Sequence, residues 1–178
     1  HQEIGEPIQC AGIVSKRTIE KSGVTDPSLN KVRGAHIHSP NGSCLKIDAG
    51  ETKAHIIDRH IFDKQLAKEA VNQGSKLWLK TRAVDWDNTN LVLKKEGVKK
   101  TLSPRVVVGA DGIGSLIRRK VTDLKPKAFL SGAQVLLKDV DVRDTDFVEL
   151  FLGNEFAPGF FSWFIPIDDD KGRLGLCV

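Results

Sequence analysis

The sequence contains no methionine and no tyrosine, and only three cysteines occur in its 178 residues. Because the cysteines are odd in number and form no CxxC pair, we expect neither a disulfide framework nor a finger-type zinc site. A reducing cytoplasm is the location expected for such a chain. No apolar run approaches the ~20 residues of a membrane-spanning helix, and the first ten residues lack the apolar segment of a signal peptide. The missing initial methionine leads us to expect an internal fragment of a longer protein.

A large excess of charge of one sign is also absent, since the 27 basic and 23 acidic residues leave a formal net charge of only +4. A nucleic-acid-binding protein concentrates basic residues and places aromatic residues beside them. Here the aromatic residues lie mostly after Phe147, away from the basic runs at Lys94–Lys100 and Arg118–Lys120. We therefore expect no nucleic-acid partner. Peripheral contact with an anionic membrane surface stays open, because each well-placed basic residue contributes up to about 1 kcal/mol to it.

The hydrophobic pattern predicts a mixed α/β first part and an antiparallel sheet in the second part. Two helices are expected before residue 75, one capped by Ser15 and a longer one that begins after Asp58 and ends at Gly74. Asn41-Gly42 between two alternating runs predicts a β-hairpin. Because Thr122–Lys127 is polar and contains a proline, we predict two domains, residues 1–122 and 128–178. Further strands are expected at residues 53–57, 77–86, 91–95, 98–102, 128–138, 147–152, 160–167 and 173–178.

A short apolar run, Val106-Val107-Val108, leads directly into Gly109-Ala110-Asp111-Gly112. Such a run predicts a strand buried on both faces, and Ser115 is a candidate cap for a helix after it. An acidic residue at the carboxyl end of a strand lies where open α/β sheets bind cofactors, although a tight turn without a ligand has the same residues. The chain contains neither GxGxxG nor a P-loop, the motifs that bind dinucleotides and nucleoside triphosphates.

Together with an earlier segment, this motif resembles the flavoproteins of the para-hydroxybenzoate hydroxylase fold. Their Asp-Gly motif matches Asp111-Gly112, and their helix with the pattern DR–FD–L–A–G matches residues 58–74. The resemblance implies FAD as the cofactor. It implies an α/β fold in which part of a Rossmann-like FAD-binding domain precedes an antiparallel β-sheet substrate domain. It also implies that FAD is bound by Arg59, by the backbone at Ala83, and by Asp111 and Gly112. On its own, Arg59 would be taken for a surface arginine.

Two further segments resemble the archaeal geranylgeranyl reductases within this family. The first, residues 7–15, matches a loop that lies against the flavin and carries a cysteine followed at +5 by a serine. The match implies that Cys10 and Ala11 contact the flavin. Cys10 is also a candidate catalytic residue, since a thiol beside a flavin can position substrate or donate a proton. From the residues alone, buried packing is the commoner role of a cysteine in such a loop.

The second segment, residues 158–177, resembles the reductases' Pro-x-x-Tyr-x-Trp-x-Phe-Pro motif with its later Gly-x-Gly. Alternating bulky apolar residues give a strand one apolar face, which suits a polyprenyl chain, although an ordinary sheet core has the same pattern. Phe161 replaces the tyrosine and lacks its hydroxyl, Ile165 replaces the phenylalanine, and Cys177 replaces the second glycine. The resemblance implies that the substrate is bound by Phe161, Trp163, Ile165, Pro166 and Gly175.

The implied activity is FAD-dependent reduction of C=C double bonds in geranylgeranyl chains of archaeal membrane lipids or their precursors. The implied partners are an isoprenoid lipid and an electron donor, such as reduced ferredoxin or NADPH, that the residues do not identify. An FAD-dependent aromatic-ring monooxygenase of the same fold is one alternative. A non-enzymatic lipid-binding domain is another if the chain is complete. Because the family's GxGxxG, its ribose-binding acid and its later Gly-Asp motif are absent, we expect the chain alone to be inactive and to bind FAD weakly.

Three other clusters are weaker candidates. His36 and His38 share one face of a predicted strand, but no third ligand accompanies them, so we expect no metal site. Asp168-Asp169-Asp170 fits a solvated hairpin turn better than a calcium site. Ser115 lacks the G-x-S-x-G context of a hydrolase nucleophile.

Overall fold

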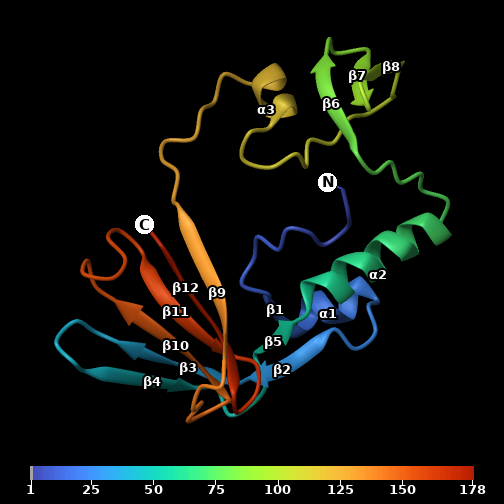
Figure 1. Cartoon of the computed structure of the whole chain (residues 1–178). Coiled ribbons are helices and arrows are strands. Elements are labelled where there is room, and N and C mark those ends of the chain that lie inside the picture. The colour runs from blue at the N-terminus through green and yellow to red at the C-terminus, as the bar shows by residue number, and fades with distance from the viewer. Residues whose placement is uncertain (1) are drawn as a thin grey trace.

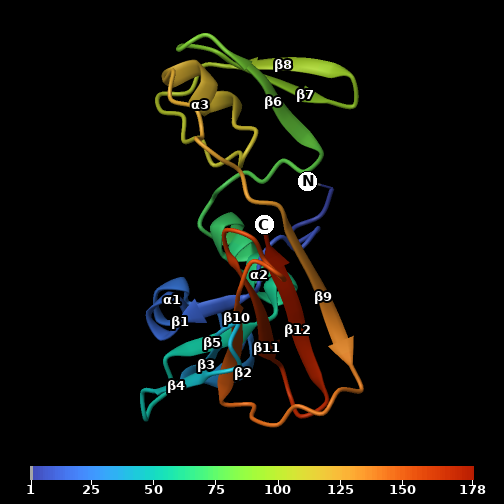
Figure 2. The ribbon, with the colours of Figure 1, turned by 90° about the vertical axis from the view of Figure 1, so that its left-hand side faces the viewer.

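The computed structural model describes residues 2–178, which fold into two lobes (Figures 1 and 2). The larger lobe contains a three-stranded sheet, a six-stranded sheet and the helices α1 (Lys16–Ser22) and α2 (Arg59–Asn72). Figure 2 shows the chain passing to the smaller lobe after α2 and returning before β9 (Gly132–Lys138). The smaller lobe consists of helix α3 (Leu116–Val121) and a sheet of β6 (Thr81–Trp86), β7 (Leu91–Lys95) and β8 (Val98–Leu102). The mixed α/β architecture agrees with the prediction.

Both helices of the larger lobe begin at the predicted caps. Ser15 Oγ accepts a hydrogen bond from the Thr18 N–H (3.2 Å) at the start of α1. Asp58 Oδ1 accepts one from the His60 N–H (2.8 Å) at the start of α2. These acceptors satisfy backbone donors that a first helical turn leaves without a partner. Gly74, with φ of +91°, follows α2 in the left-handed conformation that ends many helices.

The three-stranded sheet of the larger lobe places the start of the chain beside the start of α2. Its central strand, β5 (Ala54–Ile57), lies between β1 (Ile13–Ser15) and β2 (Ser28–Val32) and is antiparallel to both. Ile13 lies opposite Ile56. The residues that precede β1 are therefore neighbours of the residues that follow β5.

The six-stranded sheet combines strands from both ends of the chain. The hairpin predicted at Asn41-Gly42 forms, and its first strand pairs in parallel with β10 (Phe147–Leu152), whereas the other pairs in this sheet are antiparallel. The predicted first domain thus contributes two strands to the sheet of the predicted second domain. The order across the sheet is β4 (Cys44–Asp48), β3 (Gly34–His38), β10 (Phe147–Leu152), β11 (Phe161–Pro166), β12 (Lys171–Cys177) and β9.

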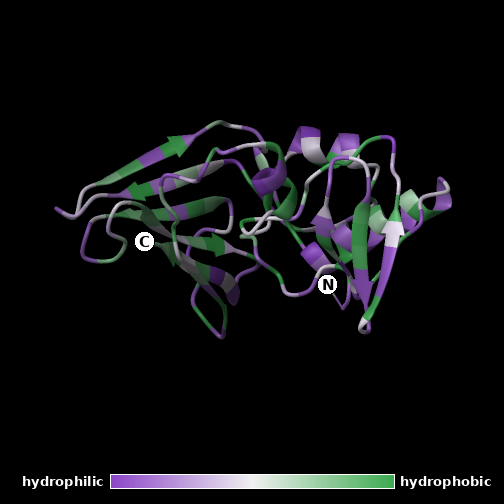
Figure 3. Cartoon of the chain, turned by 90° about the horizontal axis from the view of Figure 1, so that it is seen from above, coloured by the Kyte–Doolittle hydropathy of each residue, from purple (hydrophilic) through white to green (hydrophobic). Residues whose placement is uncertain are grey.

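The hydrophobic core of the larger lobe joins its two sheets. Val32 and Ile56 of the small sheet pack against Val148 and Ile165 of the large one, and each of the four is at most 9% exposed. Burying one such side chain contributes roughly 1.5–3 kcal/mol. A second cluster packs α2 against the small sheet and consists of Val24, Ile57 and Phe62. Figure 3 shows hydrophobic and hydrophilic residues succeeding each other along the strands, as expected for sheets with one buried face.

The prediction of a buried strand at Val106–Val108 is wrong. These residues are not in a strand, and the exposed fractions of Val106 and Val108 are 77% and 83%. A strand needs a neighbour that pairs with its backbone N–H and C=O groups, and within residues 2–178 no strand pairs with this segment. The strand predicted at residues 77–86 likewise begins only at Thr81, where pairing with β7 starts.

Gly175 of the predicted substrate motif lies under the indole of Trp163, its partner on the neighbouring strand. A Cβ atom added at Gly175 would lie 2.5 Å from Trp163 Cζ2, and one added at Gly172 would lie 2.2 Å from Phe164 Cζ. A glycine within a strand often marks such a close approach. The two glycines of β12 therefore make room for the aromatic rings of β11.

We expect Gly175→Ala to destabilise the protein, because the added methyl group must displace the Trp163 ring. Overpacking of this kind costs roughly 1–3 kcal/mol. Gly114→Ala is the matched control, since no atom lies within 4 Å of a Cβ atom added there. Thermal unfolding followed by tryptophan fluorescence measures both variants. Equal melting temperatures for the two variants would contradict the proposed contact.

Candidate functional site

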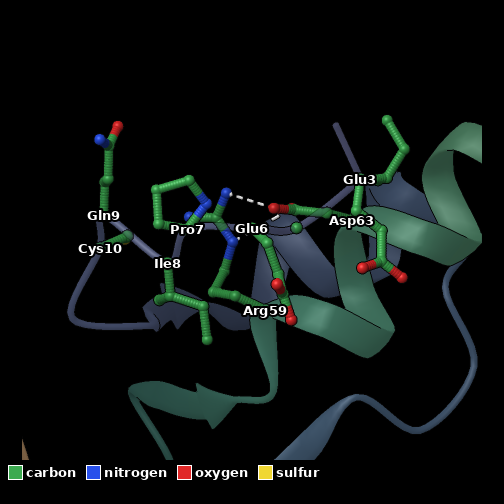
Figure 4. Close-up of a pocket in the computed structure, with 10 residues that line it drawn as sticks. Glu3, Glu6, Pro7, Ile8, Gln9, Cys10, Arg59 and Asp63 are labelled. Atoms are coloured by element: carbon green, nitrogen blue, oxygen red, sulfur yellow. Dashed lines mark hydrogen bonds and ion pairs between the residues drawn. The ribbon is translucent and has the colours of Figure 1, made fainter. Parts of the chain in front are cut away.

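The predicted flavin loop and the predicted FAD-binding arginine lie at the same end of the small sheet, where β1 begins and β5 ends. The Cys10–Ala11 loop lies just before β1, and Arg59 is the first residue of α2, directly after β5 and its cap. Their meeting follows from the antiparallel pairing of β1 with β5. Figure 4 shows the Arg59 side chain extending from α2 toward the segment of residues 7–10.

Arg59 is held in place by Asp63, one helical turn further on. Its Nε donates to Asp63 Oδ1 (3.1 Å) and its Nη2 donates to Oδ2 (2.8 Å), a bidentate geometry that matches guanidinium to carboxylate. The hydrogen bond with Asp63 raises the pKa of Arg59, and Cys10 acts in the same direction. Three of the five N–H donors of a guanidinium remain for other acceptors. Asp63 thus orients the charge of Arg59 without using up its donors.

A cleft of about 310 Å³ lies between Arg59 and the N-terminal segment, lined by residues 3–10 with Arg59 and Asp63. Cys10 is exposed on its wall, and Cys10 Sγ accepts a hydrogen bond from the Gly12 N–H (3.4 Å). The volume lies at the lower end of the range for small-molecule sites. The cleft therefore suits one part of a dinucleotide rather than the whole of it.

The acidic residues of the cleft have basic neighbours. Glu3 Oε1 lies 3.3 Å from Lys64 Nζ, and Glu6 Oε1 lies 3.6 Å from His60 Nε2. Lys64 and Arg59 thus offset the negative charges of Glu3 and Asp63. An anionic cofactor group bound here would use the remaining donors of Arg59.

Arg173 contacts the flavin loop from the six-stranded sheet, and sequence reasoning missed it. Arg173 Nη1 donates to the Ala11 carbonyl (2.7 Å) and Nη2 donates to the Ile57 carbonyl (3.0 Å). Burial lowers the pKa of Arg173, while the charge of Asp58 opposes that change. The pattern of β12 does not distinguish Arg173 from a solvent-facing arginine. The only trace of this contact in the sequence is the glycine at position 12. The structure explains it, because a Cβ atom added there would lie 2.3 Å from Arg173 Nη1.

Phe161, Trp163 and Ile165 project from one face of β11, as their alternation predicted. The rings of Phe161 and Trp163 meet edge to face with centroids 6.1 Å apart, and Trp163 Nε1 donates to Gln134 Oε1 (3.1 Å). Ile165 is 3% exposed and belongs to the core, and Trp163 packs on that core together with Ala11. This aromatic face and the predicted flavin loop therefore pack on the same core.

Pro166 lies on the opposite face of β11 from Ile165. Its side chain is fully buried, and its carbonyl accepts a hydrogen bond from Asn30 Nδ2 (3.1 Å). This contact holds the end of β11 against β2. The structure thus brings Phe161, Trp163 and Gly175 together on one face and places Pro166 behind them.

The other predicted FAD-binding residues, Ala83, Asp111 and Gly112, belong to the smaller lobe. Ala83 lies at a β-bulge of β6. Ser115 is the N-cap of α3, as predicted, because its Oγ accepts a hydrogen bond from the Arg118 N–H (2.9 Å). The Asp111 carboxylate supports this helix start by accepting hydrogen bonds from the Ser115 hydroxyl and the Leu116 N–H. The hydrogen bond from Ser115 is the main cause that lowers the pKa of Asp111. The structure therefore divides the predicted FAD-binding residues between a set at the cleft and a set beside α3.

His36 and His38 both contact the carboxylate of Glu149, which the spacing of residues along the sequence did not indicate. His36 Nδ1 lies 2.9 Å from Glu149 Oε1, and His38 Nε2 forms a hydrogen bond with Glu149 Oε2. The ring of His36 stacks on Phe147 with centroids 4.9 Å apart. Among residues 2–178, no group of three or more His, Cys, Asp or Glu side chains is placed to hold a metal ion.

The aspartate run also has a structural partner. Lys171 Nζ lies 3.1 Å from Asp168 Oδ2 and 2.8 Å from Asp170 Oδ1, and these contacts raise the pKa of Lys171. The cluster is a turn between β11 and β12, where a solvated hairpin was predicted.

The chain and its fold belong to a known class of cofactor-binding proteins. The chain belongs to the FAD binding domain family, whose pattern matches residues 9–177. It is 35% identical over 190 residues to a digeranylgeranylglycerophospholipid reductase of Methanothrix thermoacetophila, an alignment that covers 99% of this chain and 48% of that protein. An uncharacterized protein of Methanocaldococcus jannaschii is 36% identical over 180 residues, which are 99% of this chain and 46% of that protein.

A solved structure with the same fold is a geranylgeranyl bacteriochlorophyll reductase-like protein from Thermoplasma acidophilum. Its TM-score with this chain is 0.84 at 24% identity, over 99% of this chain and 48% of that one. The chain spans about half the length of the curated relatives that it matches. The predicted fold, FAD-binding family and resemblance to the geranylgeranyl reductases are confirmed.

We expect Arg59→Ala, in the protein at its natural length, to weaken FAD retention. A charge-assisted hydrogen bond to a phosphate or ribose oxygen is worth about 1.5–3 kcal/mol, which corresponds to a roughly tenfold to hundredfold loss of affinity. Arg17→Ala, at an exposed arginine on α1, is the control. Flavin content after gel filtration measures the effect. Equal flavin content in both variants and the wild type would refute the role of Arg59.

Proposed function

We propose that this chain is part of an FAD-dependent reductase that saturates C=C double bonds in geranylgeranyl chains of archaeal lipids. The observation that carries the proposal is that two segments pack on one hydrophobic core. The aromatic face of β11 and the Cys10–Ala11 loop pack on the same core, with Trp163 and Ala11 on its edge. A lipid lying along this face would reach the loop that is predicted to contact the flavin. The names of the relatives support the same substrate class.

The residues of the chain supply binding, orientation and a proton. The hydride comes from reduced FAD when it is bound. Phe161 and Trp163 hold the apolar chain and exclude water from the alkene. We assign to Cys10 Sγ the proton that reaches the second alkene carbon, after which the thiolate is reprotonated from solvent. Arg59 and the flavin loop hold one part of the cofactor at the cleft, and Asp111 and Gly112 are proposed to contact another.

Reduction of a defined lipid tests the proposed function. The protein at its natural length is incubated without oxygen with dithionite, which replaces the unidentified donor, and with a digeranylgeranylglyceryl phospholipid. Mass spectrometry should show the addition of two hydrogen atoms per double bond. Lipid binding without reduction would instead indicate a lipid-binding domain. Oxygen consumption coupled to hydroxylation of phenols in the presence of NADPH would indicate an aromatic-ring monooxygenase.

We expect Trp163→Ala to impair reduction of long isoprenoids more than flavin binding, because the indole aligns the alkene on the proposed lipid face. If Trp163 were only a core residue, the variant would lose roughly 3–5 kcal/mol of stability and much of its soluble yield. Melting temperature, flavin content and lipid reduction are measured on one preparation. A folded, flavin-loaded variant with unchanged reduction would contradict the assignment.

We further propose that the smaller lobe contacts an anionic membrane surface peripherally. Within residues 2–178, no helix is both long and apolar enough to cross a bilayer. Residues 76–127 contain 13 basic and 5 acidic residues, a net charge of +8, so that the other 14 basic and 18 acidic residues carry −4. Such an asymmetry orients a protein toward a negatively charged surface.

Three cations form a row across the sheet of the smaller lobe. Arg82 lies opposite Lys94, and Lys94 lies opposite Lys99. All three are exposed, and none forms an ion pair with an acidic residue within residues 2–178. Like charges directly opposite each other destabilise a sheet, and an anionic surface would offset that cost.

We expect the triple change Arg82→Gln, Lys94→Gln and Lys99→Gln to lower binding to vesicles of phosphatidylglycerol and phosphatidylcholine at least tenfold. The estimate assumes about 1 kcal/mol for each basic residue at the surface. The matched control removes one arginine and two lysines from the larger lobe, with Arg17→Gln, Lys21→Gln and Lys68→Gln. Cosedimentation measures binding, with vesicles of phosphatidylcholine alone as the uncharged reference. An equal loss in both triple variants would contradict the assignment of this surface.

A further inference from the structure

We propose that Arg173 is a positioning residue that fixes the lipid-facing strands relative to the flavin loop. The inference rests on the proposed function, because that function assigns ligands to these two segments. Arg173 lies on β12 opposite Ile165 and two residues before Gly175, on the face that carries Trp163. Its guanidinium leaves the sheet and reaches the carbonyl of Ala11, the residue after Cys10 on the wall of the cleft.

The guanidinium joins three segments that are far apart in the sequence. Arg173 itself is on β12, Ala11 is 162 residues earlier, and Ile57 is 116 residues earlier. Arg173 donates to the Ala11 carbonyl in the flavin loop and to the Ile57 carbonyl at the end of β5, directly before the cap of α2. A single side chain therefore sets the position of the loop and of the strand end that precedes Arg59.

These two bonds differ from an ordinary ion pair. Among residues 2–178, Arg173 forms no ion pair, and the charge of Asp58 acts on it only from a distance. Both hydrogen-bond acceptors are neutral carbonyls, and the side chain is partly buried. An apolar side chain would bury the same area without the cost of desolvating a charge. What the guanidinium adds is two donors in a rigid fork, which a lysine cannot reproduce.

The flavin loop is shaped around this guanidinium. Gly12 has φ of +74°, and a Cβ atom added to it would lie 2.3 Å from Arg173 Nη1. The Ile57 N–H donates to the Gly12 carbonyl (2.7 Å), so β5 holds the same loop from its other side. A shift of the guanidinium would therefore move Ala11, and with it the adjacent Cys10.

The proposed reaction is sensitive to such a shift. Hydride transfer requires the alkene to lie in near-attack geometry, and a displacement of 1 Å can cost about a hundredfold in rate. Arg173 contacts neither substrate nor cofactor in this proposal. It acts by holding the loop at a fixed place beside the aromatic face.

The test compares Arg173→Met, Arg173→Lys and the control Arg143→Met in the protein at its natural length. Arg143 is an exposed arginine in the loop between β9 and β10. Hydrogen–deuterium exchange of the peptides around residues 9–14 and 54–58, measured without flavin, reports on the loop. Steady-state reduction of the geranylgeranyl lipid gives kcat and KM, and thermal unfolding reports on global stability.

We expect Arg173→Met to increase exchange in both peptides at least fivefold and to lower kcat at least tenfold with a small change in KM. Arg173→Lys should restore part of kcat, because an ammonium can still donate to one carbonyl. A lower melting temperature with unchanged local exchange and unchanged kcat would overturn the proposal. If the wild type does not reduce the lipid, the proposed function fails, and the exchange measurement still decides whether Arg173 holds the loop.

Discussion

The burial of Ile56 between the two sheets of the larger lobe is the contact on which the candidate site depends. Ile56 is fully buried, lies opposite Ile13 in the small sheet and packs in the same cluster as Ile165 of the large sheet. The pairing with Ile13 places the predicted flavin loop beside the start of α2. The packing with Ile165 places the aromatic strand β11 on the same core. Loss of this one side chain would therefore weaken the core that joins the proposed cofactor-binding and lipid-binding segments.

Hydrogen bonds complete what apolar packing begins. Packing of Val32, Ile56, Val148 and Ile165 brings the sheets together but does not fix their relative position to a fraction of an ångström, because the hydrophobic effect is not directional. Directional contacts supply that precision at the rim of the core. The Arg173 fork is one of them, and the bond from Asn30 to the Pro166 carbonyl, which joins the same two sheets, is another.

The features that the sequence predicted correctly are local ones. Ser15 and Asp58 cap the helices that follow them, and Asn41-Gly42 turns a hairpin, because each motif acts on backbone atoms a few residues away. Val106–Val108 failed as a strand because a strand depends on a neighbour, which periodicity cannot supply. The partner of His36 is Glu149, 113 residues distant, and no spacing rule could indicate it.

In the candidate site, too, local motifs could be predicted from the sequence and long-range contacts could not. The family resemblance pointed to Cys10, Arg59 and Trp163, of which the structure places the first two at the cleft and the third on the core between the sheets. The same resemblance includes Asp63 as the second acid of the DR–FD pattern but gives it no role, and the structure shows that Asp63 orients Arg59. Arg173 lies outside the matched FAD-binding segments and contacts the loop from the far end of the chain. Its importance depends on three-dimensional contacts that a motif does not record.

The parallel pairing of β3 with β10 has a consequence for how the protein folds. The paired residues are more than a hundred positions apart, so the entropy of closing this loop is lost before the contact is gained. During synthesis the hairpin of β3 and β4 leaves the ribosome long before its partner strand exists, with one edge of β3 unpaired. Pairing of β3 with β10 must therefore wait for residues near 150, and until then β3 has an edge that is open to pairing with another chain.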